Sequence, residues 1–561
     1  MMNRALRFLS RETRGMHQAA YLLAAFALAS QLLGLLRDRV LAALFGASHT
    51  LDIYYAAFRV PDLLFATVAS LFSLYALLPI LSRLETEGEG LMISFLRDIL
   101  GVFFAAMCSI SLILYALAPV LAPLIAPGLA DASGSSADLV LLMRILLLQP
   151  ILLGASNTIA SLTQLRHRFL LYSVSPLLYN LGIIFGAVAL YPRMGLSGLG
   201  WGVVLGAAMH MLVQIPYFLV EKTHVRLSLS SMFRRLYEVL MLSIPRTLAL
   251  ASTQISLFAL IAIASFLAMG SITVFTFAFN LQAVPLTIIG VSYSVAAFPT
   301  LARLHAQGSR AEFLQYVEAA LRHILFWSIL ASVFVIVMRA QIVRVILGAG
   351  QFDWNATRLT AAALALFVLS LSAQSITLLI ARAYYATGNT RKPLYFGCAD
   401  ITISILSTLL LVALFHSSAF FQEFVGSLLR VDGVLGTSVL MIALGYALGS
   451  IAKGGISYWY FTRDFSISRS RLARLVFECF ASAIIGGAAT YIILSATGAA
   501  GEINTTIGLL AQGLLAGTVG LAISALMLWL LKNEEFTEAL SALKRRFVDV
   551  SQIAVEPSDV S

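Results

Sequence analysis

The sequence predicts an all-α, polytopic membrane protein with about fourteen transmembrane helices. Three observations support this fold class: 60% of the 561 residues are hydrophobic, only 11% are charged, and the mean hydropathy is +0.91. Soluble globular proteins carry roughly 25% charged residues, and one membrane-spanning helix needs roughly 20 apolar residues. The apolar runs of this chain reach or exceed that length, which excludes the soluble fold classes.

The apolar runs define the predicted spans, and short polar or charged segments separate them. In chain order the fourteen predicted spans are 19–45, 53–81, 99–125, 139–162, 169–191, 199–220, 239–269, 274–301, 319–338, 359–385, 394–415, 434–460, 475–494 and 507–531. Runs near thirty residues exceed one straight bilayer crossing, which indicates helices that tilt, break or protrude.

The basic residues favour one side of the membrane. With a cytoplasmic N-terminus, 24 of the 37 Lys and Arg residues fall in the predicted cytoplasmic segments, and the outer loops hold only Arg193, Arg339, Arg344, Arg358 and Arg430. The positive-inside rule therefore predicts that both termini are cytoplasmic. Because this rule also accounts for the net charge of +10, we expect no nucleic-acid partner.

A short pattern, Pro-x-Leu-small-Arg-Leu, occurs at 79–84 and again at 299–304. Six spans separate the copies, so both point the same way. The repeat predicts two parallel six-helix lobes, 19–220 and 221–463, followed by a helix pair in 464–532; chance similarity in a biased sequence is the alternative. Residues 1–18 and 533–561 are predicted to be cytoplasmic, and 534–548 could form an amphipathic helix on the membrane surface.

Eight basic residues remain in or at the ends of spans, where an ionised side chain costs roughly 2.5–3.5 kcal/mol and usually faces a polar interior. Arg37 and Asp38 are adjacent and are predicted to lie on different helix faces, whereas Asp52 and Arg59 are two turns apart on one face. One interpretation is a cationic chamber wall with orienting carboxylates; the other is snorkelling at the outer interface. These two interpretations concern the charges near the front of the chain, namely Arg37, Asp38, Arg39, Asp52, Arg59 and Asp62. The other five of the eight basic residues are Arg144, Arg246, Arg322, Arg382 and Lys453.

Charges farther along the chain have similar alternatives. Arg144 and Arg246 could face a cavity or form buried ion pairs, while Arg322 and Arg382 lie near cytoplasmic helix ends and are predicted to snorkel. Asp400 could bind Na⁺ or a proton, or neutralise an arginine. The sequence has neither a Gly-rich phosphate loop nor a His-Glu metal helix, so we expect a transporter without catalytic residues or a cofactor.

Several motifs resemble the MurJ/MviN family of the multidrug/oligosaccharidyl-lipid/polysaccharide exporter superfamily. The most specific block is 30–39, followed by 45–47, Asp52 and 57–64; further matches lie at 245–248, 254–255, 298–301, 350–353, 381–386 and 390–393. The resemblance implies a bacterial cytoplasmic-membrane protein with fourteen helices in two lobes plus a C-terminal pair, around a central cationic cavity.

The resemblance also implies an activity and a partner. The expected function is a lipid II flippase that translocates this undecaprenyl-diphosphate-linked muropeptide by alternating access, as a monomer surrounded by membrane lipids. Reset would use membrane potential or Na⁺, with Asp400 as the ion site. By the resemblance, Arg37 and Asp52 fall on positions that the family needs for flipping, and Arg59 and Arg246 on commonly basic or cavity-lining ones. Together with Asp38, Arg39 and Arg144, which the charge pattern adds, these are the expected substrate-binding residues.

The sequence also departs from the family pattern. Gln31, Ala66 and Asn280 stand where members carry arginines, and Ser70 stands where the family often has glutamate. Three alternatives therefore stay open: a flippase for another polyprenyl-linked glycan, a cation or drug antiporter, and a non-transporting membrane scaffold. A drug antiporter would favour acidic and aromatic cavity walls, and the arginines near the front of the chain argue against it.

Overall fold

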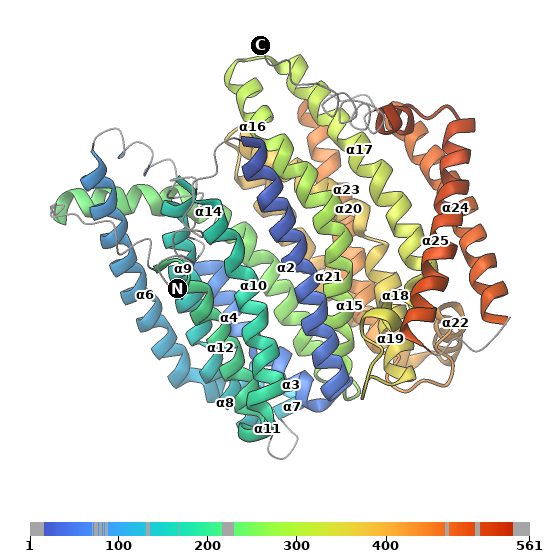
Figure 1. The fold of residues 1–561 in the computed structure, drawn as a ribbon, viewed down its shortest axis with the longest axis horizontal. Helices are drawn as coiled ribbons and strands as arrows, with labels where there is room; N and C mark the ends of the chain where they lie inside the picture. The colour runs from blue at the N-terminus through green and yellow to red at the C-terminus, as the bar shows by residue number, and fades with distance from the viewer. Residues whose placement is uncertain are drawn as a thin grey trace, which may run out of the picture. The chain divides into compact units, whose positions relative to one another are not determined.

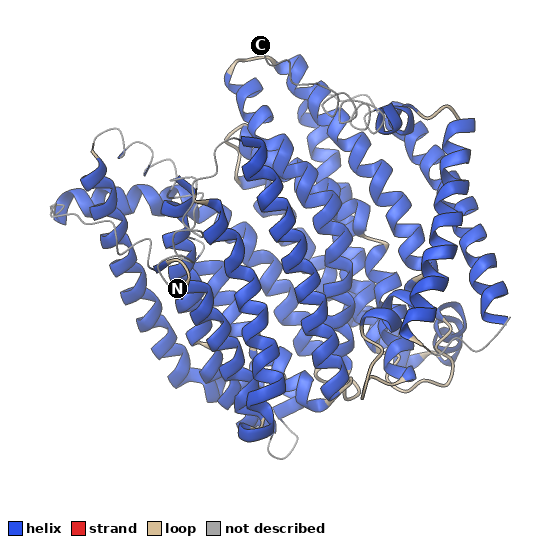
Figure 2. Ribbon diagram, in the orientation of Figure 1, coloured by secondary structure: helices blue, strands red, loops and turns tan. Residues whose placement is uncertain are grey.

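The computed structural model describes residues 16–69, 71, 77, 81, 84, 88–130, 135–165, 168–215, 229–465, 470–499 and 505–541. Within these residues the chain is helical and contains no strand (Figure 2), as the sequence predicts. Nine helices in the same residues are long and apolar enough to cross a membrane, and a tenth candidate is the pair Trp354–Val368 and Leu371–Ala386, bent by 45°. The all-α membrane class is confirmed, and the exact number of fourteen spans stays a prediction.

Each predicted span overlaps one helix or a consecutive series of helices (Figure 1). In the first half of the chain these are α2 (Met16–Phe45), α3 (His49–Ala57), α4 (Arg59–Leu64), η1 (Phe65–Ala69), α6 (Glu89–Ile125), α7 (Pro127–Ala130), α8 (Ser135–Leu146), α9 (Leu148–Leu165), α10 (Phe169–Phe185), η2 (Gly186–Leu190), α11 (Tyr191–Met194), α12 (Leu196–Leu212) and α14 (Leu229–Ala264).

The second half of the chain also consists of helices joined by short connections. Its elements are α15 (Ser271–Leu286), η3 (Thr287–Val291), α16 (Ser292–Ala306), α17 (Arg310–Val337), α18 (Arg339–Ile346), α19 (Trp354–Val368), α20 (Leu371–Ala386), α21 (Arg391–Ser417), α22 (Ala419–Leu429), α23 (Val439–Phe465), α24 (Ser470–Ala499) and α25 (Thr506–Leu530).

These elements form two compact units that interleave along the chain. One unit takes the described parts of Met1–Leu281, Ile346–Ala363 and Thr390–Gly449; the other takes those of Gln282–Val345, Leu364–Asn389 and Ser450–Ser561. The units are not consecutive stretches of sequence, so they do not test the predicted lobe boundaries at 220/221 and 463/464, which stay predictions.

In the first unit, α10 packs against α2 and α12 (Figure 1). The contact between α10 and α12 is made by glycines, because a methyl group at Gly182 or Gly186 would overlap the backbone of Gly206 or Gly202. Gly198, Gly202 and Gly206 recur every four residues and line one face of α12. Small residues at this spacing let membrane helices approach closely.

The end of α2 is joined to two loops that are remote in sequence. The backbone N–H of Gln351 donates to the carbonyl oxygen of Ala43 at 2.9 Å, and Gly350, with φ +56°, lies directly against Ala43. Gly270, with φ +86°, lies against Ala47. Positive φ and the lack of a Cβ are both required here, which favours glycine. Gly46, with φ +64°, lies against the backbone of Gln351, so the sequence blocks 45–47 and 350–353 meet in space.

Two π-helical segments support the internal repeat. η1 begins at Phe65 and η3 at Thr287, 222 residues apart, close to the 220-residue offset of the Pro-x-Leu pattern. Each follows a proline, Pro61 or Pro285, and proline removes a backbone donor from the helix. A third π-helix, η2, lies between them in sequence. Most of the first copy of the Pro-x-Leu pattern lies outside the described residues.

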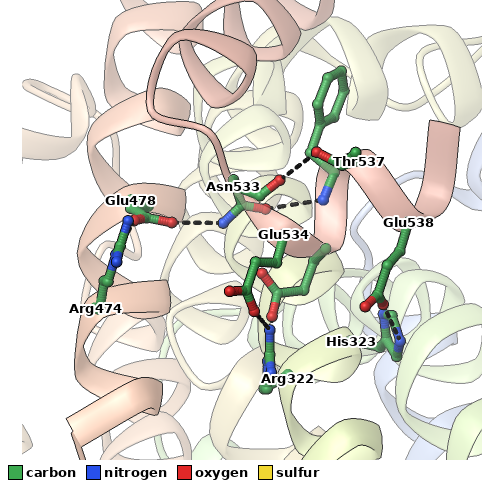
Figure 3. Close-up of polar contacts among 10 residues, drawn as sticks. Arg322, His323, Arg474, Glu478, Asn533, Glu534, Thr537 and Glu538 are labelled. Carbon is green, nitrogen blue, oxygen red and sulfur yellow. Dashed lines mark hydrogen bonds and ion pairs between the residues drawn. The ribbon is translucent and has the colours of Figure 1, made fainter. Parts of the chain in front are cut away.

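In the second unit, residues 534–541 form a short helix that packs against α17 (Figure 3). Arg322 donates to Glu534 at 2.6 Å and also pairs with Glu535, while the Nε2 atom of His323 lies 3.6 Å from Glu538. We call these five residues the tail clamp. Arg322 was predicted to snorkel; that stays a prediction, and the structure shows that two carboxylates of its own chain bind its guanidinium.

The start of this segment is also fixed to α24. The side chain of Asn533 is almost fully buried and donates to Glu478 at 2.8 Å (Figure 3), and Glu478 accepts from Arg474 at 2.6 Å. The predicted amphipathic helix 534–548 is helical over 534–541, where it contacts protein; its remainder lies outside the described residues.

Candidate functional site

The guanidinium of Arg37 is bound on two sides within the first unit. Its Nε and Nη2 atoms donate to Oδ1 of Asp38 at 3.0 and 2.8 Å, and its Nη1 atom donates to Oδ1 of Asn180 on α10 at 3.1 Å. The adjacent residues Arg37 and Asp38 were predicted to lie on different helix faces, but they form an ion pair. The long arginine side chain reaches along α2 far enough to meet its neighbour.

The second oxygen of Asp38 is also occupied. Nδ2 of Asn280, on α15, donates to Oδ2 of Asp38 at 3.0 Å. Asn180, Arg37, Asp38 and Asn280 therefore form one hydrogen-bonded chain across α10, α2 and α15. Asn280 is one of the positions where the resemblance implies an arginine, and here its amide fixes a carboxylate.

A second ion pair joins Arg59 to Asp62, one turn later on α4, at 3.8 Å. Nε of Arg59 also donates to the carbonyl oxygen of Tyr55 at 3.3 Å. Both ion pairs lie in the first unit, one on α2 and the other on α4. We call Arg37, Asp38, Arg59 and Asp62 the arginine cluster.

The side chain of Asp52 points toward the start of α15. Its carboxylate accepts from the backbone N–H of Gly270 at 2.6 Å, and from the N–H and hydroxyl of Thr273 at 2.8 and 2.7 Å. The first N–H groups of a helix lack partners inside the helix and favour a negative charge. The shared face predicted for Asp52 and Arg59 is interrupted at Phe58, between α3 and α4.

Three other predicted site residues, Arg39, Arg144 and Asp400, make contacts outside the arginine cluster, and a fourth, Arg246, has no described side chain. Arg39 donates to the carbonyl oxygen of Ile346 at 3.3 Å. Arg144 donates to the carbonyl oxygen of Tyr115 at 3.2 Å and stacks over its ring at 4.6 Å, on the exposed side of α6. The binding roles of Arg39, Arg144 and Arg246 stay predictions.

Asp400 is buried on α21, with the Ser404 hydroxyl 3.4 Å from its Oδ1 atom. Among the described residues, no group of three or more His, Cys, Asp or Glu side chains is placed to hold a metal ion. A carboxylate and a hydroxyl are oxygen ligands that suit a hard cation. The Na⁺ site at Asp400 therefore stays a prediction with two candidate ligands.

The arginine cluster is electrically balanced, since each arginine faces one carboxylate. A guanidinium binds phosphate oxygens with the same paired donors that it offers to a carboxylate. A phosphate that binds Nε and Nη2 of Arg37 would compete with Asp38 for these two donors. Sequence analysis did not identify Asn180, although an asparagine inside an apolar span is a signal that could have revealed it.

Comparisons with known proteins agree with this architecture. The chain is 27% identical over 483 residues to a probable lipid II flippase MurJ of Rhizobium tropici, covering 83% of this chain and 85% of the relative. It is 26% identical over 398 residues to a lipid II flippase MurJ of Burkholderia cenocepacia, covering 69% and 77%.

Solved structures show the same fold. The structure of a lipid II flippase MurJ in an inward closed conformation matches with a TM-score of 0.70 at 20% identity, over 91% of this chain and 100% of that one. An inward-facing multidrug resistance transporter of the MATE family matches with a TM-score of 0.62 at 14% identity, over 78% and 94%. The family model of lipid II flippase MurJ matches residues 41–512, and this chain therefore belongs to that family.

Proposed function

We propose that this chain flips lipid II across the bacterial cytoplasmic membrane by alternating access, with both termini in the cytoplasm. The observation that carries the proposal is the guanidinium of Arg37, which holds a carboxylate with two nitrogens inside an apolar helix. The match to the lipid II flippase MurJ family over 41–512 supports the choice of substrate.

The diphosphate of lipid II is the part of the substrate that this site can bind. Nε and Nη2 of Arg37 point the same way, toward Oδ1 of Asp38, and a phosphate oxygen in that position would receive both donors. Asn280 keeps its hydrogen bond to Asp38, so the displaced carboxylate stays anchored and can pair with Arg37 again after release. Arg59 and Arg246 are the further cations that we assign to the substrate.

The test is complementation of a bacterium depleted of its own lipid II flippase. The wild-type chain should restore growth and outward exposure of lipid II, whereas Arg37→Ala should fail to do so. Arg193→Ala, which removes an exposed arginine from α11, is the matched control and should complement fully. A well-expressed, inserted wild-type chain that never restores lipid II exposure would contradict the proposal.

Na⁺ coupling at Asp400 is a separate part of the proposal. The burial of this carboxylate beside the Ser404 hydroxyl supports it. Asp400→Asn should remove the dependence of transport on Na⁺ while leaving the protein folded. Transport that is indifferent to Na⁺, to pH and to Asp400→Asn would leave membrane potential as the driving force.

A further inference from the structure

We propose that α22 (Ala419–Leu429) is an interfacial helix that inserts one face into the lipid leaflet next to the end of α21. The helix lies in the segment 416–433, between the eleventh and twelfth predicted spans. In the structure this helix exposes large apolar side chains: Phe420 is 79% exposed, Phe424 is 52% exposed and Leu428 is 63% exposed. Nothing in this inference depends on the transported substrate.

The exposed side chains of α22 are sorted by type. Phe420, Phe424 and Leu428 recur every four residues and so form one stripe along the helix. Glu423 and Ser427, which are also exposed and also four apart, form the adjacent stripe. One exposed flank is therefore apolar and the other polar, which is the arrangement of a helix that lies in a membrane surface.

The remaining face of α22 fixes its rotation. Val425, Gly426 and Leu429 are buried against the protein. The hydroxyl of Ser418 accepts from the N–H of Phe421 and caps the first turn. After the last turn, the carbonyl oxygen of Arg430 accepts from Nε and Nη2 of Arg358 at 3.0 and 2.7 Å. The buried face and the bonds from Arg358 keep the apolar stripe turned outward.

The depth of α22 follows from its connection to α21. Only Ser418 separates the two helices, so α22 begins where α21 ends. The 27 residues of α21 rise about 1.5 Å each, which is more than the roughly 30 Å of a bilayer core. Exposed leucines extend along this span to its last turn, namely Leu406, Leu409, Leu410 and Leu414.

Lipid is therefore the occupant that the surroundings favour. The apolar stripe of α22 begins six residues after Leu414, the last exposed leucine of α21. At this level phenylalanine and leucine can enter the boundary between headgroups and acyl chains. Beyond the helix, Leu435 is 92% exposed and extends the same apolar character into the next connection. The stripe itself contains no charged residue.

Site-directed fluorescence tests this inference in purified full-length protein in liposomes, without lipid II or any partner. In a background with Cys108, Cys398 and Cys479 replaced by Ala, a bimane label is placed at Phe424→Cys or, as the matched control on the polar stripe, at Ser427→Cys. Lipids with a doxyl group near the headgroup should quench the label at 424 several-fold more than at 427. Aqueous iodide should show the opposite order.

A single result overturns the proposal. This result is iodide quenching of the label at 424 that is as strong as at 427, together with no quenching of the label at 424 by doxyl lipids. The stripe would then face water and would be a docking surface for another protein. Size-exclusion profiles that match the unlabelled protein ensure that both variants are folded. Since transport is not measured, failure here leaves the proposed flippase function untouched.

Discussion

Arg37 and Asp38 show how single residues set the charge of the site. The arginine is held by one carboxylate and one amide, and the carboxylate by a second amide. A hydrogen bond to a charged group contributes about 1.5–3 kcal/mol. These contacts therefore fix the geometry of Arg37 but also give a substrate phosphate a competitor.

Replacing Asn280 tests this competition. Asn280→Arg should place a second cation beside Oδ2 of Asp38, so that Asp38 holds Arg37 less tightly and apparent affinity for lipid II rises several-fold. Asn180→Arg is the matched control: it sets a like charge beside Nη1 of Arg37 and should lower stability and transport. Binding of lipid II to purified variants measures the effect. Equal affinities of the two variants for lipid II would contradict the competition between Asp38 and the substrate phosphate.

Asp52 is a residue whose predicted role and observed contacts differ. It was grouped with the substrate-binding residues, yet its oxygens accept three hydrogen bonds from the start of α15. Asp52→Asn should lower the free energy of unfolding by about 2–3 kcal/mol, because an uncharged amide group cannot accept all three of these hydrogen bonds.

The melting temperature of purified protein measures the effect of Asp52→Asn. Thr273→Val, which removes only the hydroxyl donor, should cost less than half as much. If Asp52→Asn abolished transport at an unchanged melting temperature, the carboxylate would act on the substrate instead.

Among the helices, α10 and α12 depend on glycine most clearly. Gly202→Ala adds a methyl group that overlaps Gly186, and overpacking of this kind costs about 1–3 kcal/mol. Gly34→Ala on α2 is the matched control, because nothing lies within 4 Å of the added methyl group and alanine favours helix. Melting temperatures should fall for the first variant and not for the second.

The tail clamp connects residues 534–538 to α17. Arg322→Ala should leave Glu535 buried without its cation, at a cost of about 3 kcal/mol. Residues 534–541 should then exchange amide hydrogens faster and be cleaved sooner by protease. Glu538→Gln disturbs only the exposed, longer contact with His323 and should change little. Unaltered hydrogen exchange in Arg322→Ala would contradict the importance of the ion pairs.

At the scale of the whole molecule, the topology rests on the distribution of basic residues. The predicted cytoplasmic segments hold 24 Lys and Arg residues and the outer loops hold 5. This asymmetry predicts that a reporter fused after residue 541 lies in the cytoplasm and that a reporter inserted at residue 432 lies outside. Alkaline phosphatase and green fluorescent protein fusions check both positions. Activity of the phosphatase after residue 541 would place the C-terminus outside.

Hydropathy and charge in the sequence were sufficient to predict the all-α membrane class and the concentration of charge near Arg37. These signals are local, since each span must satisfy its own backbone and bury its own apolar surface in lipid. The motif resemblance added the family, which the comparisons confirmed.

Only the tertiary structure decided which side chains meet. Arg37 and Asn180 are 143 residues apart, Asp52 and Thr273 are 221, and Arg322 and Glu535 are 213. Hydropathy and helical periodicity describe one segment at a time, and they do not specify the register in which remote helices pack. The sequence by itself therefore determined that this chain is a helical membrane protein with arginines near its front, while packing determined that those arginines are already paired.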